Sequence, residues 1–197
     1  MSVRLGQEVQ EVPRRLARPE PALADDAIWL EPLTEALVPD LGWVLDGDPD
    51  TGRFTRIPFE PDAAFLSGWL GRYEGVWNDG SGTSAGFAVR DTASGDAVGF
   101  AGFVHLDLDQ HEGEIGYVVA PAARGRGVAG RAVRLLTRWG FDALALERIE
   151  LRIDPANEAS SRIAQRQGYT LEGTLRSTYF KEGVRSDVAV WSRLAAD

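Results

Sequence analysis

The sequence predicts a mixed α/β fold, in which about four helices flank a central, twisted, mostly antiparallel sheet of about seven strands. Two observations support this prediction. Segments that alternate apolar and polar residues, typical of strands, are interspersed with segments of helical spacing. In addition, a helical segment joins the strand at 114–119 to the strand at 148–154, which is the connection that a parallel pair requires. Such a pair can splay apart and leave backbone groups free for an extended ligand.

The first part of the chain is expected to be irregular. Residues 1–24 are charged and interrupted by three prolines, so they favour a tail or an irregular wrap before a single domain at 25–197. Ala27–Leu33 is the first expected strand, and Thr34 can cap the helix that follows it. Residues 46–58 contain two glycines and two prolines, which predict a turn-rich loop.

Helices and strands then alternate up to the C-terminus. The expected elements are a helix at 60–77, strands at 84–90, 98–107 and 114–119, a helix from 128, a strand at 148–154, a helix at 157–167, and a hairpin of strands at 171–180 and 184–194. In the helix at 60–77, the aromatic residues Trp69, Tyr73 and Trp77 fit either a packed core or the wall of a substrate pocket.

Composition excludes several classes of protein. The formal net charge of −9 argues against a nucleic-acid partner and is compatible with a cationic substrate. Without cysteine and with only two histidines, His105 and His111, a metal site is not expected. No apolar run approaches the roughly 20 residues of a membrane span, and the first residues lack a signal-peptide pattern, so we expect a cytoplasmic protein without a membrane partner.

One stretch, Glu114 to Leu136, organises the rest of the chain. A strand ends at Pro121, a loop with Gly125 and Gly127 follows, and an amphipathic helix begins at Val128. A glycine loop before a helix directs backbone N–H groups and the positive end of the helix dipole at an anion such as a phosphate. A plain strand-to-helix turn that happens to contain two glycines fits the loop equally well when the loop is taken alone.

Four motifs in this order resemble the GNAT acetyltransferases. Arg124-x-x-Gly127-x-Ala129 resembles the family's acyl-CoA pyrophosphate loop, and Glu114-Ile115-Gly116-Tyr117 its central strand. Asn157-x-x-Ser160, followed by Gly168-Tyr169, resembles the helix that lies along the pantetheine arm. The stretch at 182–188 is similar to the Rim-type branch, which acetylates N-terminal alanines of ribosomal proteins. The resemblance covers residue 27 to the C-terminus and implies the GNAT fold.

The resemblance also implies how the chain would hold acetyl-CoA, with no metal required. The cofactor-binding residues that it implies are Val118, Val119, Arg124, Gly125, Arg126, Gly127, Val128, Ala129, Asn157 and Ser160. A backbone N–H near Val119 would polarise the thioester carbonyl. Asn157 would contact the pantetheine or brace the loop beside it, and it can also serve as the N-cap of its own helix.

The catalytic residues implied by the resemblance are Glu114 and Ser160. Glu114 would take the proton of the acceptor amine, although a glutamate paired with an arginine at a strand edge fits as well. Ser160 would lie near the sulfur as a proton donor, or be a small helix residue only. The tyrosine that many family members place four residues before the glycine is Ala164 here, which leaves the general acid undetermined.

Three further residues are weaker candidates for the chemistry. Tyr169 and Tyr179 are candidates to replace the missing tyrosine, although core packing suits both better. His105 lies on the strand before Glu114 and is expected to be packed or at the surface rather than in the site.

The implied function is an acetyl-CoA-dependent N-acetyltransferase that works by direct attack of a primary amine in a ternary complex. The acceptor is either a protein N-terminus or a small cationic molecule. The alternatives are an enzyme that modifies antibiotics or polyamines, which the acidic charge favours, and a non-catalytic CoA-binding module. The sequence leaves the oligomeric state open, a homodimer included.

Overall fold

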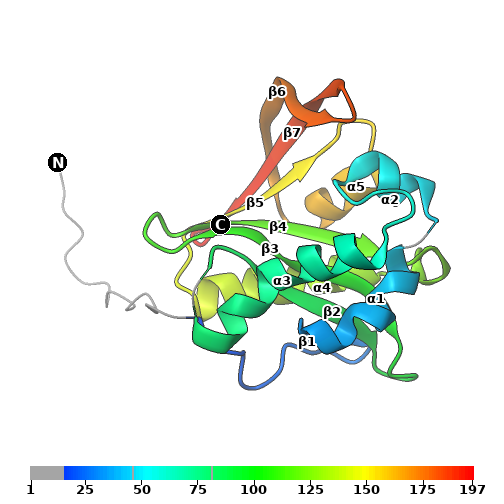
Figure 1. Cartoon of the computed structure of the whole chain (residues 1–197). Helices are drawn as coiled ribbons and strands as arrows, with labels where there is room; N and C mark the ends of the chain where they lie inside the picture. The colour runs from blue at the N-terminus through cyan, green and yellow to red at the C-terminus, as the bar shows by residue number, and fades with distance from the viewer. Residues whose placement is uncertain (1–15, 46, 81) are drawn as a thin grey trace, which may run out of the picture.

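The computed structural model describes residues 16–45, 47–80 and 82–197 of the chain (Figure 1). The elements in chain order are β1 (Ile28–Pro32), η1 (Glu35–Leu37), α1 (Val38–Leu45), α2 (Pro49–Phe54), α3 (Ala63–Asp79), β2 (Ala85–Asp91), β3 (Ala97–Asp107), β4 (Glu112–Val119), η2 (Pro121–Ala123), α4 (Val128–Asp142), β5 (Arg148–Ile153), α5 (Glu158–Arg166), β6 (Thr170–Lys181) and β7 (Val184–Leu194). The predicted mixed fold is confirmed, and so is the order of its strands.

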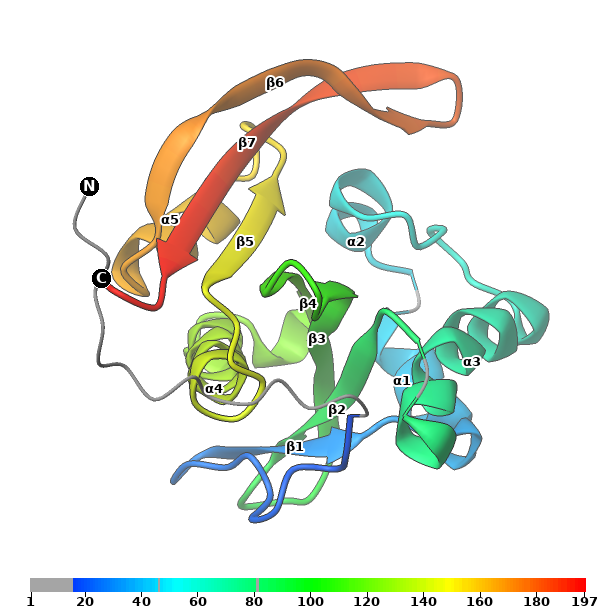
Figure 2. The same cartoon turned by 90° about the vertical axis from the view of Figure 1, so that its left-hand side faces the viewer.

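All seven strands form one sheet in the order β1-β2-β3-β4-β5-β7-β6. Every neighbouring pair is antiparallel except β4 and β5, which are parallel. Their pairing comprises only three residue pairs and ends at Glu114 opposite Glu150. Beyond this point the two strands diverge, as Figure 2 shows from the side. The predicted splayed pair is therefore present, and it opens the sheet in its middle.

The prediction of a plain loop at residues 46–58 is wrong. Residues 49–54 form the helix α2, whose N-cap Asp48 accepts a hydrogen bond from the backbone N–H of Thr51 at 2.9 Å. Pro49 is the first helical residue, where its fixed φ angle suits a helix and its missing N–H costs nothing. Pro49 is thus the start signal of a short helix rather than a turn signal. Asp46 lies outside the described residues.

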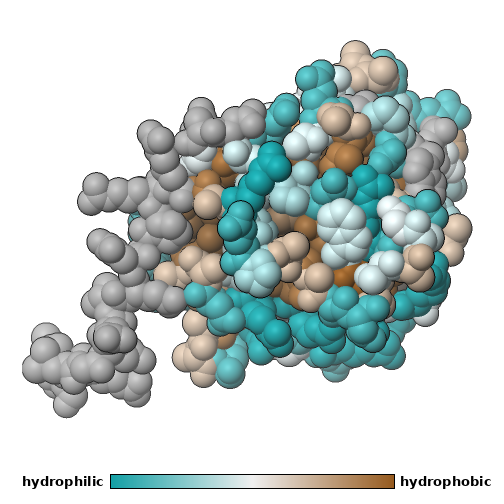
Figure 3. All heavy atoms as spheres, turned by 90° about the horizontal axis from the view of Figure 1, so that it is seen from below, coloured by the Kyte–Doolittle hydropathy of each residue, from teal (hydrophilic) through white to brown (hydrophobic). Residues whose placement is uncertain are grey.

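The two faces of the sheet have separate hydrophobic cores. On one face, α4 packs its apolar stripe against the sheet, with Trp139 edge-on to Phe87 at 5.6 Å between ring centroids. On the other face, α1 and α3 cover a second cluster, in which Trp69 lies 4.6 Å from Phe100. Burying each of these aromatic side chains stabilises the fold by roughly 1.5–3 kcal/mol. Seen from below, hydrophilic residues surround the apolar areas of the surface (Figure 3).

The segment before β1 is attached to α4 in the described part of the chain. Leu16 is buried in the α4-side core, and the N–H of Leu30 donates to the carbonyl of Leu23 at 2.8 Å. Asp25 forms ion pairs with Arg131 at 2.9 Å and Arg134 at 2.6 Å. Residues 16–25 thus run as an irregular segment along the domain, and the division of the chain at residue 24 stays a prediction.

The β6–β7 hairpin extends away from the rest of the sheet (Figure 1). Most residues of β6 are exposed, and none of them is fully buried. Near its end, the ammonium group of Lys181 donates to the carbonyl oxygens of Gly52, of Thr55 at 2.8 Å and of Ile57 at 3.3 Å. Lys181 therefore binds the C-terminal end of α2 to the hairpin.

Candidate active site

A groove of about 610 Å³ runs between the end of β4, the start of α4 and α5, and we call it the glycine-loop groove. Its volume is in the range of small-molecule sites. Nine of the ten predicted cofactor-binding residues line it: Val118, Val119, Arg124, Gly125, Gly127, Val128, Ala129, Asn157 and Ser160. The splayed strands and the glycine loop therefore form one binding surface.

The glycine loop presents bare backbone to this groove. Gly125 and Gly127 have φ angles of 76° and 81°, in the left-handed region that glycine adopts without strain. Gly127 is the N-cap of α4 and offers no side chain to satisfy the first N–H groups of the helix. These N–H groups and the helix dipole are thus available to an anion.

The two arginines of the loop point to different places. The guanidinium of Arg124 donates to the carbonyl of Val119 at 3.1 Å and pairs with Asp48, the N-cap of α2. Burial alone would raise the pKa of Asp48, but hydrogen bonds from Arg124 and Thr51 outweigh it and lower that pKa. Arg126 pairs with Asp91 at 2.6 Å, outside the groove. Any contact of Arg126 with a ligand in the groove would therefore be made by its backbone.

Asn157 and Ser160 are joined at the start of α5. The side-chain oxygen of Asn157 accepts a hydrogen bond from the N–H of Ser160 at 3.1 Å, so the predicted N-cap is confirmed. Both side chains also line the groove, so Asn157 can cap its helix and still contact a bound pantetheine arm or brace the loop beside it. The cap fixes the first turn of α5 and with it the position of the Ser160 hydroxyl.

A second cavity lies on the other side of β4, and we call it the Glu114 cavity. It has two connected parts of about 440 and 180 Å³. The larger part meets the glycine-loop groove where both are lined by the same residues: Phe54, Thr55, Tyr117, Val118, Asn157 and Ser160. A ligand held in the groove could therefore reach a second ligand held beside Glu114.

Glu114 is the central acidic group of this cavity. Desolvation raises the pKa of its carboxyl group, and the opposing charge of Arg152 only partly offsets this. The Nε atom of Arg152 lies 3.6 Å from Oε2 of Glu114 and also 3.1 Å from Glu150. The arginine pair expected at a strand edge is therefore present, and Glu114 also faces a cavity, while its role as proton acceptor stays a prediction. A carboxylate with a raised pKa is a better proton acceptor near neutral pH.

The backbone of β4 supplies a donor at the junction of the two spaces. The N–H of Ala120 donates to the carbonyl of Val98 on β3 at 2.9 Å. Because successive N–H groups of a strand point to opposite edges, the N–H of Val119 faces the opening toward β5. No β4–β5 pair forms beyond Glu114 in the described ranges. This geometry suits the polarising donor expected near Val119.

Tyr117 is a candidate that the sequence does not single out. Its hydroxyl group is buried at the junction and has no hydrogen-bond partner of good geometry in the described part of the chain. Burial raises the pKa of Tyr117, which the nearby Ser160 hydroxyl partly opposes, so the phenol keeps its proton at neutral pH. A buried donor without a partner, aimed at a groove, points to a ligand. In the sequence it is only an aromatic residue in a strand, where core packing is the usual role.

The weaker candidates lie outside the chemistry or at its edge. Tyr169 is buried and shares a hydrogen bond of 2.7 Å with Thr137, in the core beside Ala164. His105 is exposed and lies opposite Glu114 in the β3–β4 register, but it lines none of these spaces. Trp69 and Tyr73 are core residues whose edges reach the Glu114 cavity, whereas Trp77 packs in the other core. Within the described residues no cluster of acidic and histidine side chains could hold a metal ion.

Comparisons with known proteins agree with this geometry. The model of the acetyltransferase (GNAT) domain matches residues 27–170. The Bacillus subtilis protein YdaF, provisionally named a ribosomal N-acetyltransferase, is 29% identical over 74% of this chain and 70% of its own. The spermidine N(1)-acetyltransferase of Escherichia coli is 29% identical over 45% of this chain and 48% of its own. A structure from Chromobacterium violaceum, described as a probable GNAT-family acetyltransferase, is 29% identical with a TM-score of 0.75 and covers 99% of this chain and 98% of its own.

The family match at 27–170 includes the glycine loop, Glu114, Asn157 and Ser160, and ends before the residues of β6 and β7 that line the Glu114 cavity. Other relatives carry the names of ribosomal-protein acetyltransferases, in agreement with the Rim-type resemblance of residues 182–188. GNAT acetyltransferases use acetyl-CoA as the acyl donor, and the bare backbone of the glycine loop fits its phosphates. The described helices include none with the length and apolar character needed to cross a bilayer. The chain belongs to the GNAT acetyltransferase family.

Proposed function

We propose that this acetyltransferase moves the acetyl group of acetyl-CoA to a primary amine by direct attack in a ternary complex. The observation that carries the proposal is that the glycine-loop groove and the Glu114 cavity meet at Tyr117 and Ser160. One space fits the donor, the other fits an acceptor beside a proton-accepting carboxylate, and the junction fits the reacting atoms. A chain without cysteine also suits direct transfer rather than a thiol intermediate.

The residues of the chain would divide the chemistry as follows. Bound acetyl-CoA supplies the acetyl thioester. Glu114 accepts one proton of the acceptor ammonium group, so that a neutral nitrogen can attack the thioester carbon. The N–H of Val119 donates to the carbonyl oxygen as negative charge develops there. The new N–C bond forms, the C–S bond breaks, and the sulfur leaves as a thiolate. The nitrogen gives up its second proton, which passes to the thiolate or to water, and leaves the neutral amide.

Two hydroxyl groups are available to the departing sulfur. Ser160 and Tyr117 lie at the junction of the two spaces, and the phenol of Tyr117 keeps its proton at neutral pH because burial raises its pKa. A thiol has a pKa near 8.5, so its thiolate leaves with little help. We therefore assign these hydroxyls mainly to positioning the sulfur by hydrogen bonds, with proton return as a secondary role.

The acceptor has two candidate classes. A protein N-terminus is favoured by the relatives named as ribosomal-protein acetyltransferases, and its α-amine, with a pKa near 8, needs only a weak base. A polyamine is the second candidate because one relative is a spermidine N(1)-acetyltransferase, although it matches less than half of this chain. We also propose that residues 25–197 form one catalytic domain and that the protein acts in the cytoplasm.

Calorimetry with acetyl-CoA, followed by release of free CoA with a panel of amines, tests the proposal. We expect heat of binding to the purified chain and steady CoA release that depends on an added amine. The panel should contain short peptides with free N-termini, the same peptides with acetylated N-termini, and spermidine. No heat at millimolar acetyl-CoA would contradict the donor site. Binding without CoA release for any amine would indicate a CoA-binding module instead of an enzyme.

A further inference from the structure

The Glu114 cavity has an excess of cationic side chains although the chain as a whole is acidic. Four guanidinium groups line its two parts, from Arg53, Arg56, Arg72 and Arg152. Three carboxylates face them, from Glu114, Asp154 and Asp187. The net charge of −9 therefore does not describe the surface that an acceptor would meet. Local charge, not net charge, governs which ligand a cleft concentrates.

The arginines of the cavity differ in what they contact. Arg152 is paired with Glu114 and Glu150. Arg56 and Arg72 instead lie over aromatic rings, at 5.2 Å from the ring centre of Tyr179 and 5.9 Å from that of Tyr73. No carboxylate lies within ion-pair distance of Arg56 or Arg72 in the part of the chain that the structure describes. Both side chains are exposed, and although the charge of Arg56 acts on Glu114, neither guanidinium forms an ion pair there.

The carboxylates of the cavity are fewer. Glu114 lies beside Arg152, Asp154 accepts the N–H of Ala156 at 2.8 Å, and Asp187 accepts the N–H of Ser177 at 2.9 Å. A polycation such as spermidine needs several carboxylates along its length to replace the hydration of its ammonium groups. Beside Glu114, which the proposed reaction uses, the described lining offers Asp154 and Asp187, and these are outnumbered by the three arginines that form no ion pair within the described residues, Arg53, Arg56 and Arg72.

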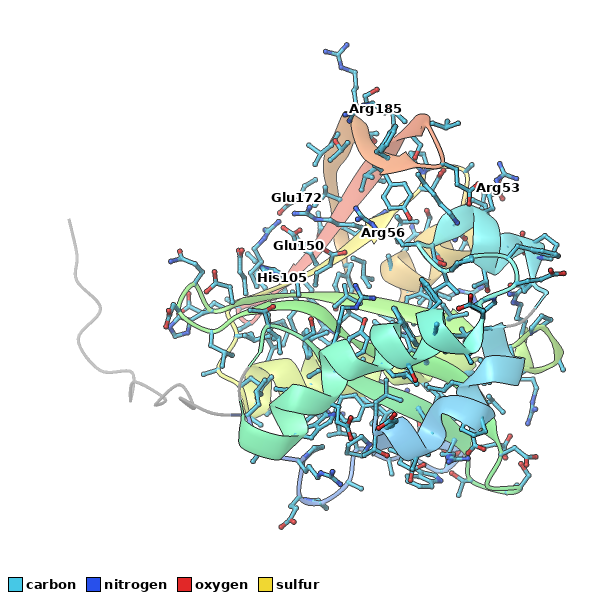
Figure 4. All side chains as sticks on the ribbon, viewed as in Figure 1. Arg53, Arg56, His105, Glu150, Glu172 and Arg185 are labelled. Atoms are coloured by element: carbon cyan, nitrogen blue, oxygen red, sulfur yellow. The ribbon has the colours of Figure 1, made fainter. Side chains whose placement is uncertain are left out.

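A second observation also points to an acidic ligand. The hydroxyl group of Tyr179 is buried, lines both parts of the cavity and has no hydrogen-bond partner of good geometry among the described residues. Its ring lies under the guanidinium of Arg56. A phenol and a guanidinium on one wall form a set of donors for the oxygens of a carboxylate or phosphate. Figure 4 shows Arg56 between α2 and the splayed strands, and Arg185 out on the β6–β7 hairpin.

We propose that the acceptor of this enzyme is a primary amine that also carries an anionic group, a carboxylate or a phosphate, bound by Arg56 and Tyr179, with Arg72 also in the cavity lining. The amine lies toward Glu114 and the anionic group lies away from the thioester. This proposal rests on the proposed function, because it describes the acceptor of the same reaction. It argues against polyamines, which the net charge of the chain favours.

Matched pairs of acceptors test this specificity. The peptide pair is Ala-Glu-Gly-amide and Ala-Gln-Gly-amide, and the small-molecule pair is 2-aminoethyl phosphate and ethanolamine, with spermidine as the polycation. We expect kcat/KM for the anionic member of at least one pair to exceed that of its neutral partner by tenfold or more. The pair that shows the preference tells whether the anion belongs to a peptide or to a small molecule.

Two variants relate the preference to the cavity. Arg56→Gln and Tyr179→Phe should each lower the ratio of kcat/KM for anionic over neutral acceptors by about fivefold or more, mainly through KM. Arg185→Gln is the control, because it removes the same charge from an exposed residue over Phe180 that lines neither space. It should leave the ratio unchanged, and all three variants should bind acetyl-CoA as the parent enzyme does.

The outcomes separate the two proposals. Equal rates for both members of each pair, or a preference for spermidine, would overturn the anionic acceptor and leave the acetyltransferase function intact. An anionic preference that Arg56→Gln and Arg185→Gln reduce equally would show a general charge effect and would also overturn the site. Absence of transfer to every amine, despite acetyl-CoA binding, would count against both proposals.

Discussion

The glycine-loop groove and the Glu114 cavity are built from different materials. The groove has two glycines in left-handed conformation and small side chains at the start of α4, where main-chain N–H groups are exposed. Arginine side chains also line it: Arg124, Arg131, Arg134, Arg162 and Arg166. The cavity is lined by charged side chains and aromatic rings from α2, α3 and the strands β3 to β7. The groove thus offers main-chain N–H groups together with arginines, whereas the cavity offers side chains of both charges and aromatic rings.

This difference has a consequence for specificity. Main-chain donors bind a feature shared by every acyl-CoA, and side-chain substitutions change them little. Because the exposed side chains that line the cavity come from several separate elements, single substitutions can adapt it to different amines. Relatives named for ribosomal proteins and for spermidine agree with a constant donor side and a variable acceptor side.

The largest expected effect comes from Glu114, which belongs to the cavity. Glu114→Gln should lower kcat by about 10²-fold or more near neutral pH, because the acceptor ammonium group loses its proton acceptor. Since desolvation raises the pKa of Glu114, the parent enzyme should lose activity as pH falls through a value above the ordinary 4.5. That acidic limb should be missing from the pH–rate profile of the variant. Steady-state kinetics between pH 5 and 9 measure both.

The control for this variant is its folding and donor binding. If a carboxyl group has a higher pKa in the folded state than in the unfolded state, its ionisation destabilises the folded protein. The loss of stability develops as the pH rises from the unfolded-state pKa through the folded-state pKa. Glu114→Gln should therefore not lower the melting temperature at pH 7, and calorimetry should show unchanged acetyl-CoA affinity. A variant with the parent's kcat and pH profile would show that bulk water or another group deprotonates the amine.

A smaller effect is expected from the groove. Gly127→Val should raise the KM for acetyl-CoA by at least about tenfold, since the new side chain occupies the space of the phosphates beside the N-terminus of α4. No protein atom lies within 4 Å of a Cβ at this position, so the added atoms meet the ligand rather than the protein. The left-handed φ angle of 81° adds strain of about 1–2 kcal/mol.

Gly95→Val provides a matched control for that strain. Gly95 lies in the β2–β3 turn with a φ angle of 78°, and a Cβ there also has no neighbour within 4 Å. Both variants should lose similar stability, measured by thermal melts, while only Gly127→Val loses affinity for acetyl-CoA. If both keep the parent's KM, the glycine loop is a turn and not an anion site.

The junction of the two spaces should be less sensitive. Ser160→Ala and Tyr117→Phe should each lower kcat by less than about tenfold, roughly 1.4 kcal/mol, because a thiolate is a tolerable leaving group without an acid. If the two hydroxyls act as one hydrogen-bonded unit, the double variant should lose no more than the worse single variant. A thousandfold loss for Ser160→Ala, with acetyl-CoA binding intact, would instead make Ser160 the general acid.

The groove could be predicted from the sequence because its signals are local. Gly125, Gly127 and the helix from 128 are adjacent in the chain, and the Asn157 cap lies three residues from Ser160. The side chain of Arg126 is turned to Asp91, a partner 35 positions away that could not be inferred from spacing, so its predicted role in binding stays a prediction for its backbone alone. Because residues that are adjacent in the sequence also lie side by side in the groove, their pattern in the sequence is enough to predict this part of the surface.

The cavity could not be predicted in the same way. Arg56, Glu114 and Tyr179 come from segments separated by more than fifty residues, and tertiary packing brings them together. The helix α2 supplies one wall of the cavity. The sequence does not predict this helix, because Pro49 indicates a turn as readily as a helix start. Tyr117 looks like any strand aromatic until its burial and missing partner are seen.

The smallest expected effect concerns the outer half of the splayed sheet. Because no apolar residue of β6 is fully buried, ion pairs are the candidate source of its stability. Arg148 on β5 donates to both oxygens of Glu172 on β6, at 2.8 and 2.6 Å, and these bonds lower the pKa of Glu172 to about 2. A lowered folded pKa contributes stability above the unfolded value of about 4.5, and this stability is lost as pH falls toward 2. Because the pair is partly exposed, water screens it, and Glu172→Gln should lower the melting temperature at pH 7 by only about 1–3 °C.

Thermal melts of both proteins at progressively lower pH check this prediction, because the difference in melting temperature between parent and variant should shrink as the pH falls. Glu158→Gln is the control, since it removes the exposed partner of Arg162 on α5. It should lower the melting temperature at pH 7 by less than Glu172→Gln does. Equal deficits for the two variants would mean that the Arg148–Glu172 pair stabilises the hairpin no more than an ordinary surface ion pair does.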